Sequence, residues 1–95
     1  MAQVRLLPGA VRDLARLDEF LRDKNDKAAD AVSLLVEKAL RRLERFPDLG
    51  KLLDDHPGYR ELYLPFGAAA YAIRYRHIES DVVIVRVWHS RERRS

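Results

Sequence analysis

The sequence predicts an α+β domain of the order β-α-α-β-β-β, with a helical hairpin packed on one face of a mostly antiparallel four-stranded sheet. Two observations carry this prediction. Apolar residues recur at three- and four-residue steps in two adjoining segments, near residues 9–24 and 27–46, which is the spacing of one helix face. On either side, apolar and polar residues alternate, as they do in half-buried strands. A length of 95 residues fits a single domain spanning residues 1–95.

The first strand is expected at residues 2–7, where Val4 and Leu6 alternate with polar neighbours. Pro8 and Gly9 end this strand, and the first helix follows. Its apolar stripe consists of Val11, Leu14, Leu17 and Leu21.

The second helix is expected to begin with Asp26 as its N-cap and to end at Phe46-Pro47. Its stripe consists of Ala28, Val32, Leu35, Val36, Ala39, Leu40 and Leu43. The short link between the two helices predicts an antiparallel hairpin.

Three further strands are predicted at residues 59–64, 68–77 and 82–88, after a loop at residues 47–58, and they form an antiparallel meander. A polar tail runs from His89 to Ser95. The residues expected to be buried are Leu14, Leu17, Leu35, Leu40, Ile73 and Val85.

Strand alternation divides the sheet into two faces. The face expected to meet the helices carries Val4, Leu6, Leu62, Leu64, Tyr71, Ile73, Tyr75, Val83, Val85 and Val87. The opposite face carries Arg5, Glu61, Tyr63, Ala70, Ala72, Arg74, Arg76, Ile84, Arg86 and Trp88. Two interpretations of this arginine-rich face stay open: a solvated sheet surface, or a contact surface on which Tyr63 and Trp88 supply anchoring area. Large apolar groups on a polar face favour the contact surface.

The amino-acid composition limits which kinds of site and partner the protein can have. The chain has no cysteine, and its three histidines lack ligand spacing, so we expect no disulfide, no metal site and no cofactor. No apolar run is long enough to span a membrane, and a cytoplasmic protein is expected. The net charge of +3 permits a nucleic acid or an acidic protein as a partner without demanding either. From Tyr59 onward there are seven arginines and no lysine, which fits phosphate or carboxylate contacts but equally fits the codon usage of a GC-rich genome.

Four motifs, in order, resemble the RelE/ParE toxins of type II toxin–antitoxin modules. They are Pro-Gly-Ala-Val-Arg-Asp-Leu at residues 8–14, Leu-Glu-Arg-Phe-Pro-Asp-Leu-Gly at 43–50, Tyr-Arg-Glu-Leu at 59–62 with Tyr-Ala-Ile-Arg-Tyr at 71–75, and the final strand from Val83 to His-Ser-Arg-Glu at 89–92. The resemblance covers nearly the whole chain. It implies a growth-arresting or plasmid-stabilising toxin with a small cognate antitoxin, ParD-like or RelB-like, as a homodimer or a toxin–antitoxin hetero-oligomer.

Within this family, RelE-like members cut mRNA in the ribosome, whereas ParE-like members inhibit DNA gyrase. RNA cleavage needs a base, an acid and a cation at the phosphate. The resemblance places the key nuclease arginine at Ala72, which supplies none of these. The ParE-like branch, an inhibitor and not an enzyme, is therefore favoured. If the chain is a metal-independent endoribonuclease instead, the candidate catalytic residues are Arg74, Arg76, His89 and Arg91.

The residues expected to bind the antitoxin or the target are Arg5, Arg60, Tyr63, Arg74, Arg76, Arg86, Trp88 and Arg91. A third class stays open, in which the chain is a non-toxic antitoxin-binding or repressor partner. Growth arrest on expression separates the two toxin classes from this one.

Overall fold

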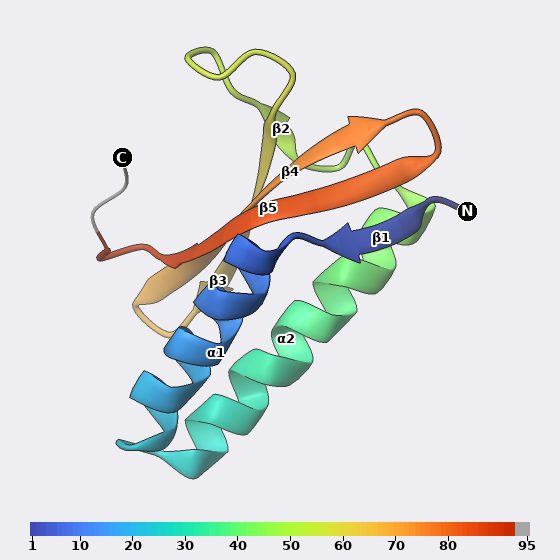
Figure 1. The fold of residues 1–95 in the computed structure, drawn as a ribbon. Helices are drawn as coiled ribbons and strands as arrows, with labels where there is room; N and C mark the ends of the chain where they lie inside the picture. The colour runs from blue at the N-terminus through green and yellow to red at the C-terminus, as the bar shows by residue number, and fades with distance from the viewer. Residues whose placement is uncertain (93–95) are drawn as a thin grey trace.

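A computed structural model describes residues 1–92 and places both helices on one face of a twisted sheet (Figure 1). The elements are β1 (Gln3–Leu6), α1 (Pro8–Arg22), α2 (Asp26–Arg45), β2 (Lys51–Leu52), β3 (Arg60–Phe66), β4 (Ala69–Ile78) and β5 (Asp81–His89). The strand order is β1-β5-β4-β3-β2, with β1 parallel to β5 and every other pair antiparallel. The predicted fold class is confirmed. The last residues of the predicted polar tail, 93–95, lie outside the described residues.

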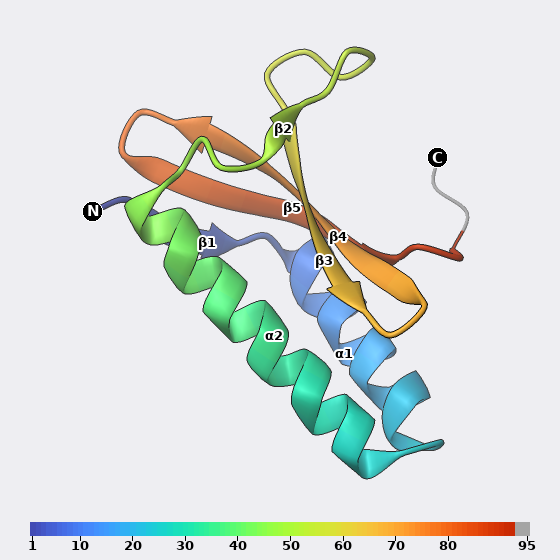
Figure 2. The ribbon, with the colours of Figure 1, turned by 180° about the vertical axis from the view of Figure 1, so that it is seen from behind.

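The sheet has five strands and not the predicted four. The additional strand, β2, consists of two residues that pair with Arg60 and Glu61 inside the segment expected to be a loop. Two residues are too few to show an alternating pattern, so the sequence alone did not reveal this strand. Seen from behind, the connection between β2 and β3 projects away from the helices (Figure 2).

The second helix is capped by Asn25 and not by Asp26. The Asn25 side-chain oxygen accepts a hydrogen bond from the Ala28 amide at 3.1 Å, and Asp26 is the first helical residue. Both residue types cap well, and the cap fell one position earlier than predicted. An acidic residue in the first turn then interacts favourably with the helix dipole.

The connection after α2 is fastened by Tyr75, whose side chain is buried in the core. Its hydroxyl donates to the Pro47 carbonyl oxygen at 2.8 Å and accepts from the Gly50 amide at 2.7 Å. A Cβ atom on Gly50 would lie 2.7 Å from the Tyr75 ring, so only glycine fits there. This contact gives the Pro-Asp-Leu-Gly motif its structural role.

The core lies between the helical hairpin and the sheet. Ile73 is fully buried, as predicted. The four leucines of the helices that were predicted to be buried are only partly buried, packed against the core: Leu14, Leu17, Leu35 and Leu40. Val85 is only half-buried and lies outside the core, so its predicted burial in the core is wrong.

A β-bulge explains this error. Tyr75 pairs with Ile84, whereas Arg74 pairs with Arg86, so no β4 residue lies opposite Val85. The extra residue inverts the alternation along β5. Ile84, predicted on the arginine-rich face, is therefore fully buried in the core together with Val82. Val83, predicted to face the helices, pairs with Arg76 on the other face.

Candidate functional site

The helix-free face of the sheet carries a row of paired charges that crosses three strands. Glu61, Arg74 and Arg86 lie side by side on β3, β4 and β5. Glu61 is only 1 % exposed, and its Oε2 accepts from Arg74 Nε at 2.8 Å and lies 2.7 Å from Arg74 Nη2. The Tyr63 hydroxyl donates to the other carboxylate oxygen at 2.9 Å. The Arg74 charge is therefore neutralised within the fold.

Asp13 of α1 neutralises Arg86 at the other end of the row, as Glu61 neutralises Arg74. Its carboxylate accepts from Arg86 Nε at 2.7 Å and from Arg86 Nη2 at 3.1 Å. It also accepts from the Val87 amide at 2.8 Å, two residues after the bulged Val85. The hydrogen bond to Asp13 raises the pKa of the Arg86 guanidinium above its usual range. Asp13 thereby joins the first helix to the last strand.

Trp88 lies between these two ion pairs. The Arg74 guanidinium is 4.7 Å and the Arg86 guanidinium 5.1 Å from its ring, within the range of cation–π contacts. Only 4 % of Trp88 is exposed. We call Asp13, Glu61, Arg74, Arg86 and Trp88 the arginine–tryptophan array. The two carboxylates pair with the arginine charges, and the indole is buried beneath the guanidinium groups. The array therefore exposes little of the charge and apolar area that was expected to attract a partner.

The other predicted binding residues are dispersed. Arg5 pairs with Asp81 at 3.3 Å, and Arg60 donates to the Asp48 and Gly50 carbonyl oxygens at 3.2 and 2.8 Å. Arg76 lies over the Tyr59 ring at 5.2 Å. Tyr63 is 52 % exposed although its hydroxyl is engaged with the array. The structure does not gather these side chains into one surface.

His89 lies on the helix side of the sheet, away from Arg74. Its ring meets the edge of Tyr71 at 5.2 Å, and its Nδ1 accepts from the Arg91 amide at 3.1 Å. Of the four nuclease candidates, the fold therefore places His89 and Arg91 together and leaves Arg74 and Arg76 on the opposite face.

His89 and Arg91 line an apolar groove that the sequence did not reveal. This cavity of about 540 Å³ lies between α1 and the ends of β4 and β5. Its lining residues are Arg16, Leu17, Phe20, Leu21, Lys24, Tyr71, His89, Arg91 and Glu92. One feature of the sequence could have indicated the groove, because Phe20 is an apolar residue on the polar side of α1. In the structure Phe20 is 63 % exposed and lines the groove.

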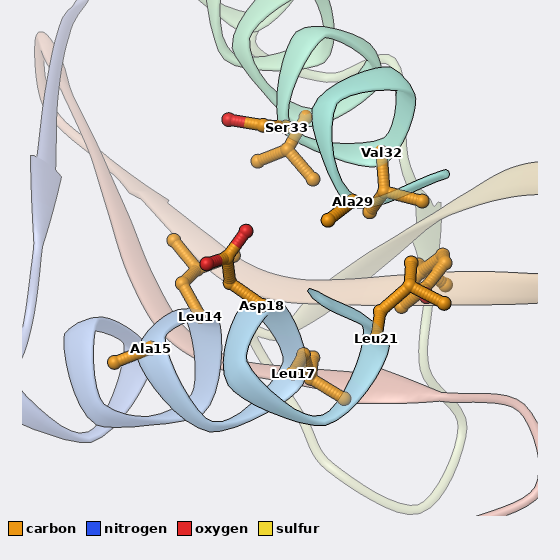
Figure 3. A pocket seen from close by; sticks show the side chains of 10 residues that line it. Leu14, Ala15, Leu17, Asp18, Leu21, Ala29, Val32 and Ser33 are labelled. Atoms are coloured by element: carbon orange, nitrogen blue, oxygen red, sulfur yellow. The ribbon is translucent and has the colours of Figure 1, made fainter. Parts of the chain in front are cut away.

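A second cavity of about 270 Å³ continues the groove between the two helices (Figure 3). The two cavities share Leu17, Leu21 and Tyr71. Burial raises the pKa of the Tyr71 hydroxyl, with a further contribution from the Glu92 charge, so this phenol stays protonated near neutral pH. An apolar floor with few polar groups is typical of a binding site.

The rim of the groove is mainly basic. Arg16 contacts Glu92 at 3.3 Å, while Lys24 lies 4.8 Å above the Phe20 ring. Glu92 also accepts from the His89 amide at 2.8 Å, which holds the segment after β5 against α1. Arg91 and Lys24 form no ion pair with a carboxylate among residues 1–92. The groove therefore suits an apolar segment that carries acidic residues.

Comparison with known proteins identifies the family. The sequence profile described as "ParE toxin of type II toxin-antitoxin system, parDE" matches residues 4–94. The chain belongs to the ParE toxin family. Its membership makes it a toxin of a type II toxin–antitoxin module, which implies an antitoxin partner. Neither helix among residues 1–92 is long and apolar enough to cross a membrane.

Relatives of this ParE-family chain carry RelE names. Toxin RelE1 of Caulobacter vibrioides is 40 % identical over 85 residues, covering 90 % of this chain and 89 % of the relative. Toxin RelE3 of the same organism is 41 % identical over 95 residues, covering 99 % and 100 %. The chromosomal ParDE system of P. aeruginosa contains a chain with the same fold, at a TM-score of 0.77 and 16 % identity, covering 94 % of this chain and 96 % of that one.

Proposed function

We propose that this toxin arrests growth by inhibiting DNA gyrase through protein contacts, and that it does not cut mRNA. The separation of the candidate catalytic groups carries the proposal. A cation at the reacting phosphate contributes about 100–1,000-fold to such a reaction, and a general base or acid a further ~100–10,000-fold. The family resemblance implies that Ala72 stands where RelE-like members place this cation. Arg74 is bound by Glu61, and His89 lies on the other face of the sheet.

Ribosome-dependent mRNA cleavage is the second candidate. It is favoured by the RelE names of the relatives and by the groove, in which His89 and Arg91 lie beside Arg16. An imidazole next to guanidinium groups has the right chemistry to move a proton near a phosphate.

The cognate antitoxin, ParD-like or RelB-like, is proposed to lay an apolar segment with acidic flanks into the groove. A segment that orders only on binding loses conformational entropy, so it needs a concave apolar site to offset that loss. The groove and the adjoining cavity offer such a site among the described residues.

Two assays separate the two activities. Purified toxin is added to a gyrase supercoiling assay, and RNA from induced cells is examined by primer extension on a model transcript. Loss of supercoiling and filamentous cells, without cuts within codons, supports gyrase as the target. Codon-specific cuts that disappear in His89→Ala and Arg91→Ala would instead assign the protein to the nuclease branch.

A further inference from the structure

The outer face of α2 carries an exposed ridge that the fold does not use. Leu34, Lys38 and Arg42 follow one another at four-residue spacing, which places them in one row along the helix, and Phe46, the C-cap residue, comes four residues after Arg42. All four are exposed, and the two apolar ends of the row are 51 % (Leu34) and 56 % (Phe46) exposed. We call this row, together with Arg45, the α2 ridge.

Leu34 and Lys38, the N-terminal part of the ridge, point away from the core. Val36, Ala39 and Leu43 form the buried side of α2. At about 100° per residue, Leu34 lies about 200° from Val36 around the helix axis. Arg42 and Phe46 lie nearer the buried side, yet all four side chains of the row are exposed in the described structure.

The cations of the ridge have no internal counter-charges. Arg22, near the hairpin tip, contacts Asp18, Asp26 and Asp30. By contrast, Lys38, Arg42 and Arg45 form no ion pair with a carboxylate among residues 1–92, and Arg45 lies 5.5 Å over the Phe46 ring. Basic residues near a helix C-terminus stabilise the helix dipole. That role does not account for exposed Leu34 and Phe46. Nor does it account for Leu49 in the connection that follows or for Leu52 in β2, both of which are exposed.

The combination of unpaired cations with exposed apolar side chains fits an acidic protein surface better than a nucleic acid. Leucine side chains add apolar area in a protein interface, whereas nucleic-acid sites rely on aromatic stacking and hydrogen bonds to bases. The ridge lies on the outside of a helix and is convex, so its partner must offer a preformed groove. A disordered segment instead needs a concave site on the toxin in which to fold. A folded target protein meets this requirement better than a flexible antitoxin segment does.

We infer that the α2 ridge binds an acidic groove on the protein that the toxin inhibits, while the antitoxin occupies the separate groove beside α1. The inference rests on the proposed inhibition of a protein target, and it adds the surface that makes the contact. The unpaired cations steer the encounter and the apolar ends anchor it.

Two variants test the ridge: Arg42→Glu with Arg45→Glu, and Leu34→Ser with Phe46→Ser. The matched control is Arg12→Glu with Lys27→Glu, which makes the same charge change at exposed helical positions. Lys27 lies about 22 Å from Arg42 along the helix. Each protein is compared in growth arrest after induction, in gyrase inhibition and in affinity for its cognate antitoxin. Thermal unfolding confirms that each variant is folded.

We expect both ridge variants to lose growth arrest and gyrase inhibition by about tenfold or more, with antitoxin affinity and the control unchanged. Retained growth arrest in either ridge variant would overturn the inference. Antitoxin affinity that falls as far as toxicity would assign the ridge to the antitoxin. Loss of mRNA cleavage would assign it to the ribosome. If the wild-type toxin does not inhibit gyrase, the proposed target is wrong, and the growth-arrest comparison still decides the ridge. A wild-type protein that arrests no growth would overturn both proposals.

Discussion

The helix-free face of the sheet and the groove beside α1 both contain arginine and aromatic side chains, yet they differ in how those groups are satisfied. On the sheet face, Arg74 and Arg86 each have a carboxylate partner, and both cover Trp88. At the groove, Arg91 and Lys24 border an apolar cavity without forming an ion pair among residues 1–92.

The difference shows that residue type alone does not identify a binding surface. An arginine bound to a buried carboxylate would have to break that pair before meeting a partner, and the cost grows with burial. Arg91, which forms no ion pair with a carboxylate among residues 1–92, has no such cost. We therefore regard the array as structural and propose the groove as the surface available to the antitoxin, a distinction that the following variants test.

Glu61→Ala should give the largest effect. It leaves the Arg74 guanidinium largely buried without its carboxylate, and the loss of unfolding free energy should be about 3–5 kcal/mol. Urea denaturation measures this loss. Glu61→Gln keeps the shape and should lose less. A loss below about 1 kcal/mol for the alanine variant would mean that the array does not support the fold.

Asp13→Ala should come second, at about 2 kcal/mol. It removes the acceptor for the Val87 amide and for Arg86, but Arg86 is nearly half exposed and regains water. Asp13→Asn can still accept from the amide and serves as the matched variant. Equal losses in the two variants would show that the Arg86 ion pair, and not the backbone hydrogen bond, supplies the stability.

Phe20→Ser should have the smallest effect on folding, within about 0.5 kcal/mol, because the side chain is mostly exposed. The same change should weaken antitoxin binding about tenfold or more, since it removes an apolar anchor from the groove. Calorimetric titration with the cognate antitoxin measures the affinity, and Val11→Ser, another exposed apolar residue of α1 outside the groove, is the control. Unchanged affinity for Phe20→Ser would remove the groove as the antitoxin site.

Much of the fold was predictable because it depends on local patterns. The three- and four-residue spacing of Leu14, Leu17 and Leu35 indicated the correct helix faces, and alternation indicated the three long strands. The side chains around Val85 were assigned to the wrong faces because a bulge inserts one residue without any local sequence signal. The short strand β2 was missed because its two residues exist as a strand only through pairing with β3.

For the candidate site, the sequence by itself determined the residue types: seven arginines and no lysine from Tyr59 onward, and a histidine at the end of the final strand. The family motifs, too, could be read directly from the chain. Only the tertiary structure decided which arginines are already paired, because Glu61 meets Arg74 on the neighbouring strand and Asp13 meets Arg86 across 73 residues of chain. It also decided where the groove lies, since a cavity depends on how far α1 stands from the ends of β4 and β5. Ion pairs and grooves form between segments that are far apart in the sequence, so the local spacing of residues does not predict them.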